Sequence, residues 1–381
     1  METLRQLDQR RATWARGLGE RWRHLSKSTR WGVALAGIVV LYILPLNNWP
    51  IVGTPDSDWD SVLFYPIGIY VLVAVGLNVV VGYSGLLDLG YVAFFAVGAY
   101  TVAILGGSNG STWTWPPAWP WLLCVPFGVG VAIVSGILLG TPTLRLRGDY
   151  LAIVTLGFGE IVRITINNMQ GLGGARGLTS LPQPPDVGPL KFGVLDSKPY
   201  YWLALTVIIG VVILMKRLEH SRVGRAWTAI REDEDAAELM GVPTFKFKLW
   251  AFAIGAAVGG LSGTLFAGYS PSVVPDQFRL LLSILFLAAV VLGGSGNIPG
   301  VILGAFLVGY LPERFRHYHE WRIFLFGLAL VVMMIFRPQG ILPSRQRASE
   351  LEHPQDQPDD ASLAGADIED SFDPSIRGDD V

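Results

Sequence analysis

Long apolar runs fill this chain between residues 31 and 337, and they constrain its fold more than any other feature. A helix needs about 20 apolar residues to cross a bilayer, and fewer where flanking side chains reach the headgroups. Runs near this length lie at about 31–47, 63–82, 88–106, 119–140, 149–168, 200–215, 249–269, 279–294, 298–312 and 321–337. The sequence predicts an all-α polytopic membrane protein with about ten transmembrane helices. The third, fifth, eighth and ninth runs are short or glycine-rich, so we expect some helices to be short or broken.

Composition agrees with a membrane protein. Only 16% of the residues are charged, against roughly 25% in soluble domains, and 51% are hydrophobic. The 45 glycines favour close helix packing in lipid. The single cysteine, Cys124, excludes an intrachain disulfide framework, and the five histidines show no metal-ligand spacing, so we predict no metal and no cofactor.

Charge divides the chain into three parts. Residues 1–30 hold eight Lys/Arg and three Asp/Glu, and apolar residues recur among them at helical spacing. This arm is interpreted as a basic amphipathic helix on anionic lipid, with a disordered tail as the alternative and no role in nucleic-acid binding. Residues 344–381 hold eleven Asp/Glu and three Lys/Arg and are predicted to be a disordered acidic tail. Between them, residues 31–343 form the membrane domain.

The positions of Lys and Arg set the expected orientation. Cytoplasmic loops are enriched in these residues. If the chain crosses the membrane ten times, its main basic clusters all lie on the cytoplasmic side: the arm 1–30, the loop 216–248, and Arg145, Arg147, Arg337, Arg345 and Arg347. Arg314 and Arg316 fall on the other side and are exceptions. We therefore expect a multi-pass protein of a bacterial plasma (inner) membrane with both termini in the cytoplasm.

The cytoplasmic loop 216–248 contains a predicted short helix at 232–241. Acidic residues begin it, as the positive end of a helix dipole prefers, and Gly241 followed by Pro243 ends it. An apolar surface on such a helix suits docking into a partner protein. An ordinary solvated loop helix is the alternative.

Asp-Ala-Ala followed by Gly at 235–241 is similar to the EAA loop of ABC importer permeases, which docks onto the ATPase subunit. Asp235 replaces the Glu of that pattern, which keeps the charge and shortens the side chain. The resemblance implies that ATPase coupling rests on Arg231, Asp235, Ala236, Ala237, Met240 and Gly241.

Three further stretches, 82–90, 146–163 and 293–300, look like the LivM-type permeases of branched-chain amino acid importers, and the resemblance covers roughly 63–343. It implies a permease for branched-chain or other neutral amino acids. Its partners would be a second, homologous permease, two ATP-binding subunits and an external binding protein. By analogy, the helices would be arranged as in type II importers such as the vitamin B12 permease.

Two alternatives remain within transport: a permease for urea or short amides in the same superfamily, and a stand-alone secondary transporter. A Walker A pattern is missing from the sequence, so ATP hydrolysis is expected on separate subunits. We find no catalytic constellation and predict that the chain is not an enzyme.

Several polar or helix-breaking residues are candidates for the translocation pathway. Glu160 and Arg163, one helical turn apart, either pair to fix helix register or line the pathway, since charges at membrane depth usually face the bundle interior. Asp88 either caps the helix that follows or lies on the pathway beside Asn78 and Tyr91. The remaining candidates are glycines and a proline that favour close packing, turns or helix breaks: Gly85, Gly296 and Pro299.

A weak internal repeat links two of these stretches. Residues such as Val79, Gly82 and Gly85 recur as Val290, Gly293 and Gly296, at an offset of 211. Transporters often contain such duplications, with the pathway between the halves; chance similarity in glycine-rich sequence is the alternative.

Overall fold

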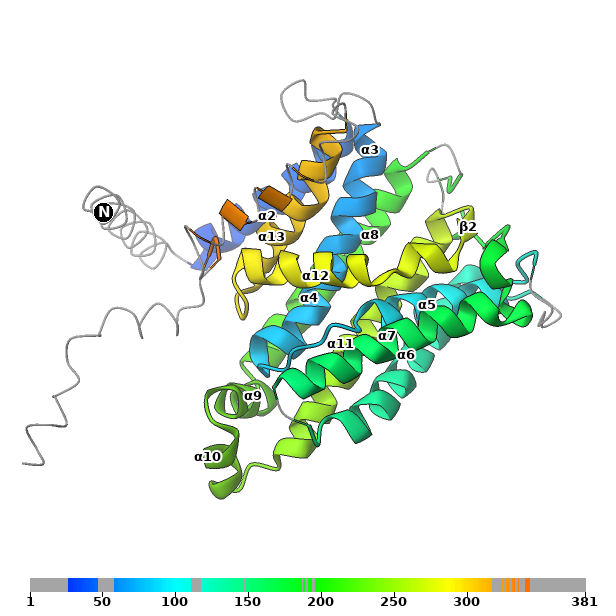
Figure 1. Ribbon diagram of the computed structural model, residues 1–381. Helices are drawn as coiled ribbons and strands as arrows, with labels where there is room; N and C mark the ends of the chain where they lie inside the picture. Colours follow the sequence, from blue (N-terminus) through cyan, green and yellow to red (C-terminus); the bar gives the residue numbers. More distant parts are fainter. Residues whose placement is uncertain are drawn as a thin grey trace, which may run out of the picture.

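The computed structural model describes residues 27–46, 58–110, 118–146, 148–186, 188, 191–193, 196–316, 324, 327, 328, 331, 332, 335 and 340–342. These residues are almost entirely helical (Figure 1). The longer helices are α2 (Lys27–Ile43), α5 (Val92–Leu105), α6 (Trp121–Thr143), α7 (Asp149–Asn168), α8 (Lys198–Glu219), α9 (Arg222–Glu232), α11 (Thr244–Tyr269), α12 (Leu280–Gly293) and α13 (Ile298–Arg314). The prediction of an all-α membrane protein is confirmed.

Five helical stretches of the described part are long and apolar enough to cross a membrane: Trp59–Tyr83, Trp121–Thr143, Lys198–Glu219, Thr244–Tyr269 and Pro275–Gly293. Two shorter apolar helices cover Leu35–Leu46, which ends in the 3₁₀ turn η1 (Leu44–Leu46), and Val92–Leu105. The predicted run at 321–337 lies mostly outside the described residues. The arm 1–30, apart from the start of α2, and the tail 344–381 also lie outside them.

The stretch Trp59–Tyr83 is one irregular rod in the centre of the bundle. It consists of α3 (Trp59–Val62), the π-helical turn η2 (Leu63–Gly68), α4 (Ile69–Asn78) and a second π-helical turn, η3 (Val79–Tyr83). Every residue of α4 is buried, including the polar Asn78. A helix that is apolar on all sides belongs in the interior of a bundle, and α4 lies there against α11, α12 and α13.

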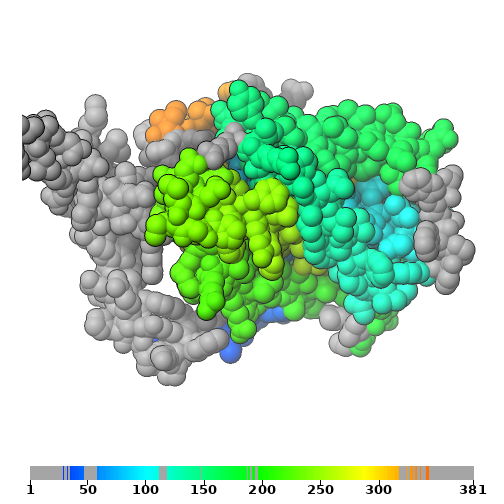
Figure 2. Space-filling view, turned by 90° about the horizontal axis from the view of Figure 1, so that it is seen from below, coloured from blue at the N-terminus to red at the C-terminus, as the bar shows by residue number. Residues whose placement is uncertain are grey.

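Helix α11 packs against α5 and α6, and backbone contact at small residues holds the three together. A Cβ added at Gly98 of α5 would collide with the carbonyl of Gly260 in α11, and Gly128 of α6 lies nearby. Such contacts let helices approach closely where lipid gives no hydrophobic driving force. Seen from below in Figure 2, α6 (blue-green) and the α9–α11 region (yellow-green) lie side by side at the surface.

Some helix ends differ from the predicted apolar runs. Helix α11 starts at Thr244, five residues before the predicted run, because its first turn packs on α9 and buries Lys248. Helix α5 starts at Val92, not at 88, because residues 84–91 form a hydrogen-bonded turn region. A hydropathy profile shows neither the packing of α11 on α9 nor the hydrogen bonds of the turn at 84–91.

At the end of the bundle remote from α9 and α10 (Glu234–Leu239), two loops are joined by a two-stranded antiparallel sheet (Figure 1). Strand β1 (Leu178–Thr179) follows α7 through the 3₁₀ turns η4 (Gln170–Leu172) and η5 (Gly174–Arg176), and β2 (Ser272–Val273) follows α11. The 3₁₀ turn η6 (Pro275–Phe278) then leads into α12. The sheet therefore holds the end of α7 beside the start of α12.

Candidate coupling and translocation sites

The short helix predicted at 232–241 is α10 in the structure, and it begins two residues later than predicted. Helix α9 ends at Glu232, and α10 begins at Glu234 after an extended Asp233 (φ −153°, ψ 113°). The Asp233 carboxylate accepts a hydrogen bond from the Ala236 backbone N–H at 3.0 Å, so it caps α10 and separates the two helices. The predicted start was two residues early because Asp233 was interpreted as a first-turn acid, whereas it is the residue that caps the helix.

The predicted end of α10 is confirmed. Gly241 has a φ of +85°, in the left-handed region, and its N–H donates to the Glu238 carbonyl at 2.9 Å. The Val242 N–H donates to the Ala237 carbonyl at 3.0 Å, which completes the double hydrogen-bond closure typical of a glycine-ended helix. Glycine is the residue that takes this conformation without steric cost.

Helix α10 exposes part of its apolar surface. Leu239 and Met240 are 88% and 85% exposed, whereas Ala237 is buried against the rest of the chain. We call Leu239 and Met240 the α10 patch. Adjacent exposed apolar side chains on a charged helix mark a surface suited to contact with another protein.

A buried ion pair and an indole fix this helical pair to the bundle. The Lys248 ammonium at the start of α11 pairs with the Glu234 carboxylate of α10, and the Lys248 side chain is 3% exposed. The Trp227 indole N–H of α9 donates to the Phe247 carbonyl at 2.7 Å. Its ring also stacks on Tyr83, at the end of η3, with ring centroids 6.5 Å apart. Both helices are thus fixed by contacts to the end of η3 and the start of α11.

Arg231 connects α9 to the glycine turn that follows η3. Its guanidinium donates to the Gly82 carbonyl, and a Cβ at Gly85 would lie 3.0 Å from the Arg231 Cγ. Gly85 has a φ of +71°, so the turn also needs glycine for its backbone. The resemblance assigned Arg231 to the docking loop; the structure shows its side chain directed inward, to the membrane domain.

The same turn is linked to the break between α12 and α13. The Asn78 side-chain oxygen accepts a hydrogen bond from the Gly296 N–H at 2.8 Å, and Gly296 has a φ of +87°. Pro299 lies in the first turn of α13, where it needs no hydrogen-bond acceptor. Gly296, in the second stretch of the proposed internal repeat, therefore contacts Asn78, the residue just before the first stretch.

Asp88 forms a turn, which corrects the predicted helix cap. Its carboxylate accepts from the Gly90 N–H at 2.9 Å, but α5 starts only at Val92 and receives no side-chain cap. Tyr91 donates its hydroxyl to the Gly255 carbonyl of α11 at 2.6 Å. Both side chains are fully buried in the described part of the chain.

Two hydroxyls that sequence reasoning missed complete the same turn. The Leu89 N–H donates to the Thr155 hydroxyl oxygen at 3.0 Å, and the Ser283 hydroxyl donates to the Leu89 carbonyl at 2.6 Å. They come from α7 and α12, which lie far from residue 89 in the sequence. A threonine or serine in an apolar run carries no signal that distinguishes this role from ordinary helix packing.

Glu160 and Arg163 form the predicted pair and join a larger cluster. The Arg163 Nε lies 3.0 and 3.1 Å from the two Glu160 carboxylate oxygens, and Nη1 lies 3.8 Å from the nearer Asp276 oxygen. Arg279 contacts Asp276 at 2.9 Å. Sequence reasoning missed Asp276 and Arg279, which flank the start of the eighth apolar run and became neighbours of α7 only through folding.

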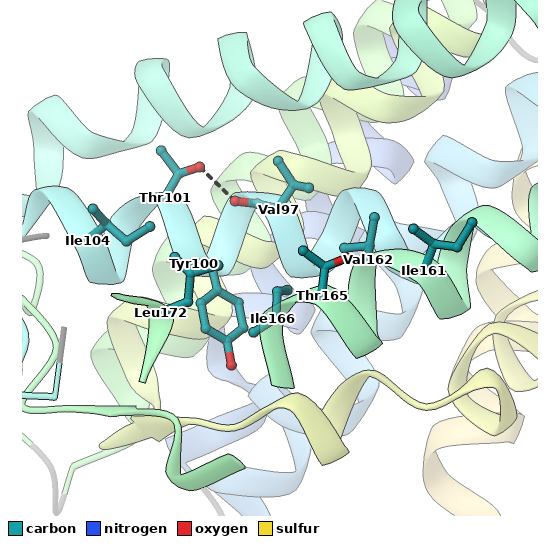
Figure 3. Close-up of a pocket in the computed structure, with 9 residues that line it drawn as sticks. All are labelled: Val97, Tyr100, Thr101, Ile104, Ile161, Val162, Thr165, Ile166 and Leu172. Carbon is teal, nitrogen blue, oxygen red and sulfur yellow. Dashed lines mark hydrogen bonds between the residues drawn. The ribbon is translucent and has the colours of Figure 1, made fainter. Parts of the chain in front are cut away.

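A cavity of about 250 Å³ opens between α5 and α7 (Figure 3). Its lining is aliphatic and aromatic, with hydroxyls as the polar groups: Val97, Tyr100, Thr101, Ile104, Ile161, Val162, Thr165, Ile166 and Leu172. The Thr101 hydroxyl is already bonded to the Val97 carbonyl at 2.7 Å. No charged group lines this cavity, so it offers no counter-charge to a charged solute. In the described part of the chain, no cluster of acidic, histidine or cysteine side chains could hold a metal.

These features define a helical membrane protein that exposes an apolar patch on a short helix between two long membrane helices. The family model described as "Branched-chain amino acid transport system / permease component" matches residues 62–337. The chain belongs to this family. It is an ABC importer permease subunit, and ATP hydrolysis is carried by separate subunits, as the sequence predicted.

Three curated relatives show the range of the family. The chain is 42% identical to the high-affinity branched-chain amino acid transport system permease protein LivM of Escherichia coli K12, over 83% of this chain and 76% of that protein. A probable LivM permease of Methanocaldococcus jannaschii is 25% identical, over 76% of this chain and 94% of that protein. The E. coli K12 permease LivH is 23% identical, over 72% and 91%. No solved structure gives a significant match.

Proposed function

We propose that this chain imports branched-chain amino acids as one of two different permeases in an ATP-driven importer. The substrate class is supported by the names of its relatives, several of which are permeases for these amino acids. The pairing is supported by LivM and LivH, two permeases of the high-affinity branched-chain system of E. coli, which both match this chain. Two ATP-binding subunits and an external substrate-binding protein complete the assembly.

The α10 patch is the observation that carries this proposal. Leu239 and Met240 project from a helix whose other side is fixed to the membrane domain by the Lys248–Glu234 ion pair. Such a helix transmits force, because a displacement of the patch moves the start of α11 with it. An ATP-binding subunit docked on the patch would therefore be mechanically connected to the membrane helices.

Two hydrogen bonds extend this connection into the bundle. The Arg231 guanidinium donates a hydrogen bond to the Gly82 carbonyl. The side-chain oxygen of Asn78, one helical turn before Gly82, accepts a hydrogen bond from the Gly296 N–H. In the proposed mechanism, closure of the ATPase dimer displaces α9 and α10. The displacement then reaches the turn between α12 and α13 through Arg231, the Gly82–Gly85 turn and Asn78, and it switches access to the pathway between the permeases.

The finer topology is part of the same proposal. About ten crossings in an arrangement like that of type II importers, with both termini in the cytoplasm of a bacterial inner membrane, place the basic loop 216–248 beside the ATPases. The basic arm 1–30 would then contact anionic lipid of the inner leaflet.

Detergent extraction of the importer tests the docking role. We expect the unmodified chain to co-purify with a second permease and with ATP-binding subunits. Replacing Leu239 and Met240 together by Glu removes two apolar contacts worth about 1.5–3 kcal/mol each when buried. We therefore expect loss of the ATP-binding subunits and of leucine uptake, with the second permease retained.

The conservative variant Leu239→Met serves as the matched control and should keep both properties. Retention of the ATPases by the double Glu variant would refute the docking site. Leucine uptake by the chain alone, without ATP, would favour a secondary transporter. Competition of leucine uptake by urea would favour the amide alternative.

A further inference from the structure

Four charged side chains of alternating sign meet at the end of the bundle remote from α10. Glu160 and Arg163 come from α7, Asp276 from η6, and Arg279 from the residue before α12. The two elements are more than a hundred residues apart in the sequence and are brought together beside the β1–β2 sheet. We call these four residues the α7–η6 charge cluster; its net charge is zero.

The cluster consists of two tight local pairs that face each other across a looser contact. The Arg163 Nε to Glu160 distances are 3.0 and 3.1 Å, and Arg279 lies 2.9 Å from Asp276. The contact between the pairs, Arg163 Nη1 to Asp276 Oδ1, is 3.8 Å, which is too long for a hydrogen bond. The two pairs thus meet through a longer-range attraction, and Asp276 Oδ1 accepts its hydrogen bond from Arg279 Nε, at 3.4 Å.

The cluster is accessible. The side chains of Asp276 and Arg279 are 64% and 65% exposed, and those of Glu160 and Arg163 are 37% and 22% exposed. Charges in contact with hydrocarbon are costly, and ionisable side chains on membrane helices usually face the protein interior or a water-filled passage. In the assembled importer, this face therefore borders water or protein, not lipid.

Apolar side chains adjoin the charges. Ile164 lies one helical turn after Glu160 on the same face of α7 and is 44% exposed, and Leu281, two residues after Arg279, is 60% exposed. A surface that places paired opposite charges beside aliphatic side chains matches one class of solute. Such a solute carries a carboxylate and an ammonium group on one carbon and an aliphatic chain beside them.

We propose that the α7–η6 charge cluster is a contact site for the zwitterionic backbone of an aliphatic α-amino acid at the mouth of the pathway. The α-carboxylate is held by the guanidinium groups of Arg163 and Arg279, which favour bidentate contact with carboxylates. The α-ammonium lies between the carboxylates of Glu160 and Asp276. Because its net charge is zero, the cluster does not concentrate simple anions or cations.

This inference rests on the proposed function and is tested with the complete importer in proteoliposomes. The probe is radiolabelled leucine, offered with saturating binding protein, and the readouts are leucine uptake and ATP hydrolysis stimulated by the loaded binding protein. The variants are Arg163→Gln and Asp276→Asn. Arg316→Gln is the matched control, because it removes another i, i+3 ion pair, to Glu313 at 3.3 Å, from the end of α13.

We expect Arg163→Gln and Asp276→Asn each to lower leucine uptake roughly tenfold, the effect of losing one hydrogen bond to a charged group, while stimulated ATP hydrolysis stays within twofold of the unmodified importer. Arg163→Lys keeps the positive charge and should recover part of the uptake. Arg316→Gln should match the unmodified importer.

Three results would overturn the site. One is uptake by both variants equal to that of Arg316→Gln. The second is an equal loss of stimulated ATP hydrolysis, which indicates a structural role. The third is a shift in the binding-protein concentration needed for stimulation, which indicates a docking contact. Absence of leucine uptake by the unmodified importer would instead refute the proposed function. Asp276→Asn alters a largely exposed carboxylate, so it keeps the test valid should Arg163→Gln fail to insert.

Discussion

Breaking the Lys248–Glu234 ion pair should detach α10 from the membrane domain. The Lys248 side chain is 3% exposed and that of Glu234 is 26% exposed, so Glu234→Gln leaves a buried ammonium without a counter-charge. Removing one partner of a buried pair costs about 3–5 kcal/mol. Since Glu234 retains some contact with solvent, we expect about 1–3 kcal/mol here.

This loss of interaction energy affects a single short helix. Helix α10 has six residues, which is too short to be stable without its tertiary contacts. Each 1.4 kcal/mol changes an equilibrium tenfold, so detachment of α10 should become about 5- to 150-fold more frequent. Hydrogen exchange of the α10 amides, followed by mass spectrometry on the purified permease, measures this change directly.

Glu238→Gln is the matched control, because Glu238 is an exposed acid on the same helix. It should leave the exchange of the α10 amides unchanged. Adding Lys248→Met to Glu234→Gln removes both charges and should restore part of the protection, since an apolar pair carries no unpaired charge. Equal exchange in Glu234→Gln and Glu238→Gln would refute the view that this pair anchors α10.

Two further predictions concern backbone contacts inside the bundle. Asn78→Leu leaves the Gly296 N–H without its acceptor at 2.8 Å, so it should lower the stability of the folded protein by about 1–3 kcal/mol. It should also reduce the amount of leucine taken up per ATP hydrolysed. Unchanged thermal unfolding in detergent, together with unchanged uptake per ATP in proteoliposomes, would contradict this. Gly98→Ala places a methyl group against the Gly260 carbonyl and should cost about 1–3 kcal/mol of stability, measured by thermal unfolding in detergent, whereas Gly130→Ala meets no atom within 4 Å and should be neutral.

The sequence by itself determined the class of protein and several local ends. Apolar runs identified the helical membrane domain because the hydrocarbon core requires internally hydrogen-bonded, apolar helices. The end of α10 at Gly241 was predictable because a left-handed backbone there depends on one residue and its immediate neighbours. The pairing of Glu160 with Arg163 was predictable for the same reason, since residues three apart share a helix face.

Only the tertiary structure decided which distant groups meet. Arg231 reaches Gly82 across 149 positions, Asn78 reaches Gly296 across 218, and Asp276 comes to lie beside Arg163. Nothing in the local pattern of any of these residues specifies its partner. The reason is physical: helix periodicity fixes which face a side chain occupies, whereas the neighbour of that face is set by the packing of all the helices together.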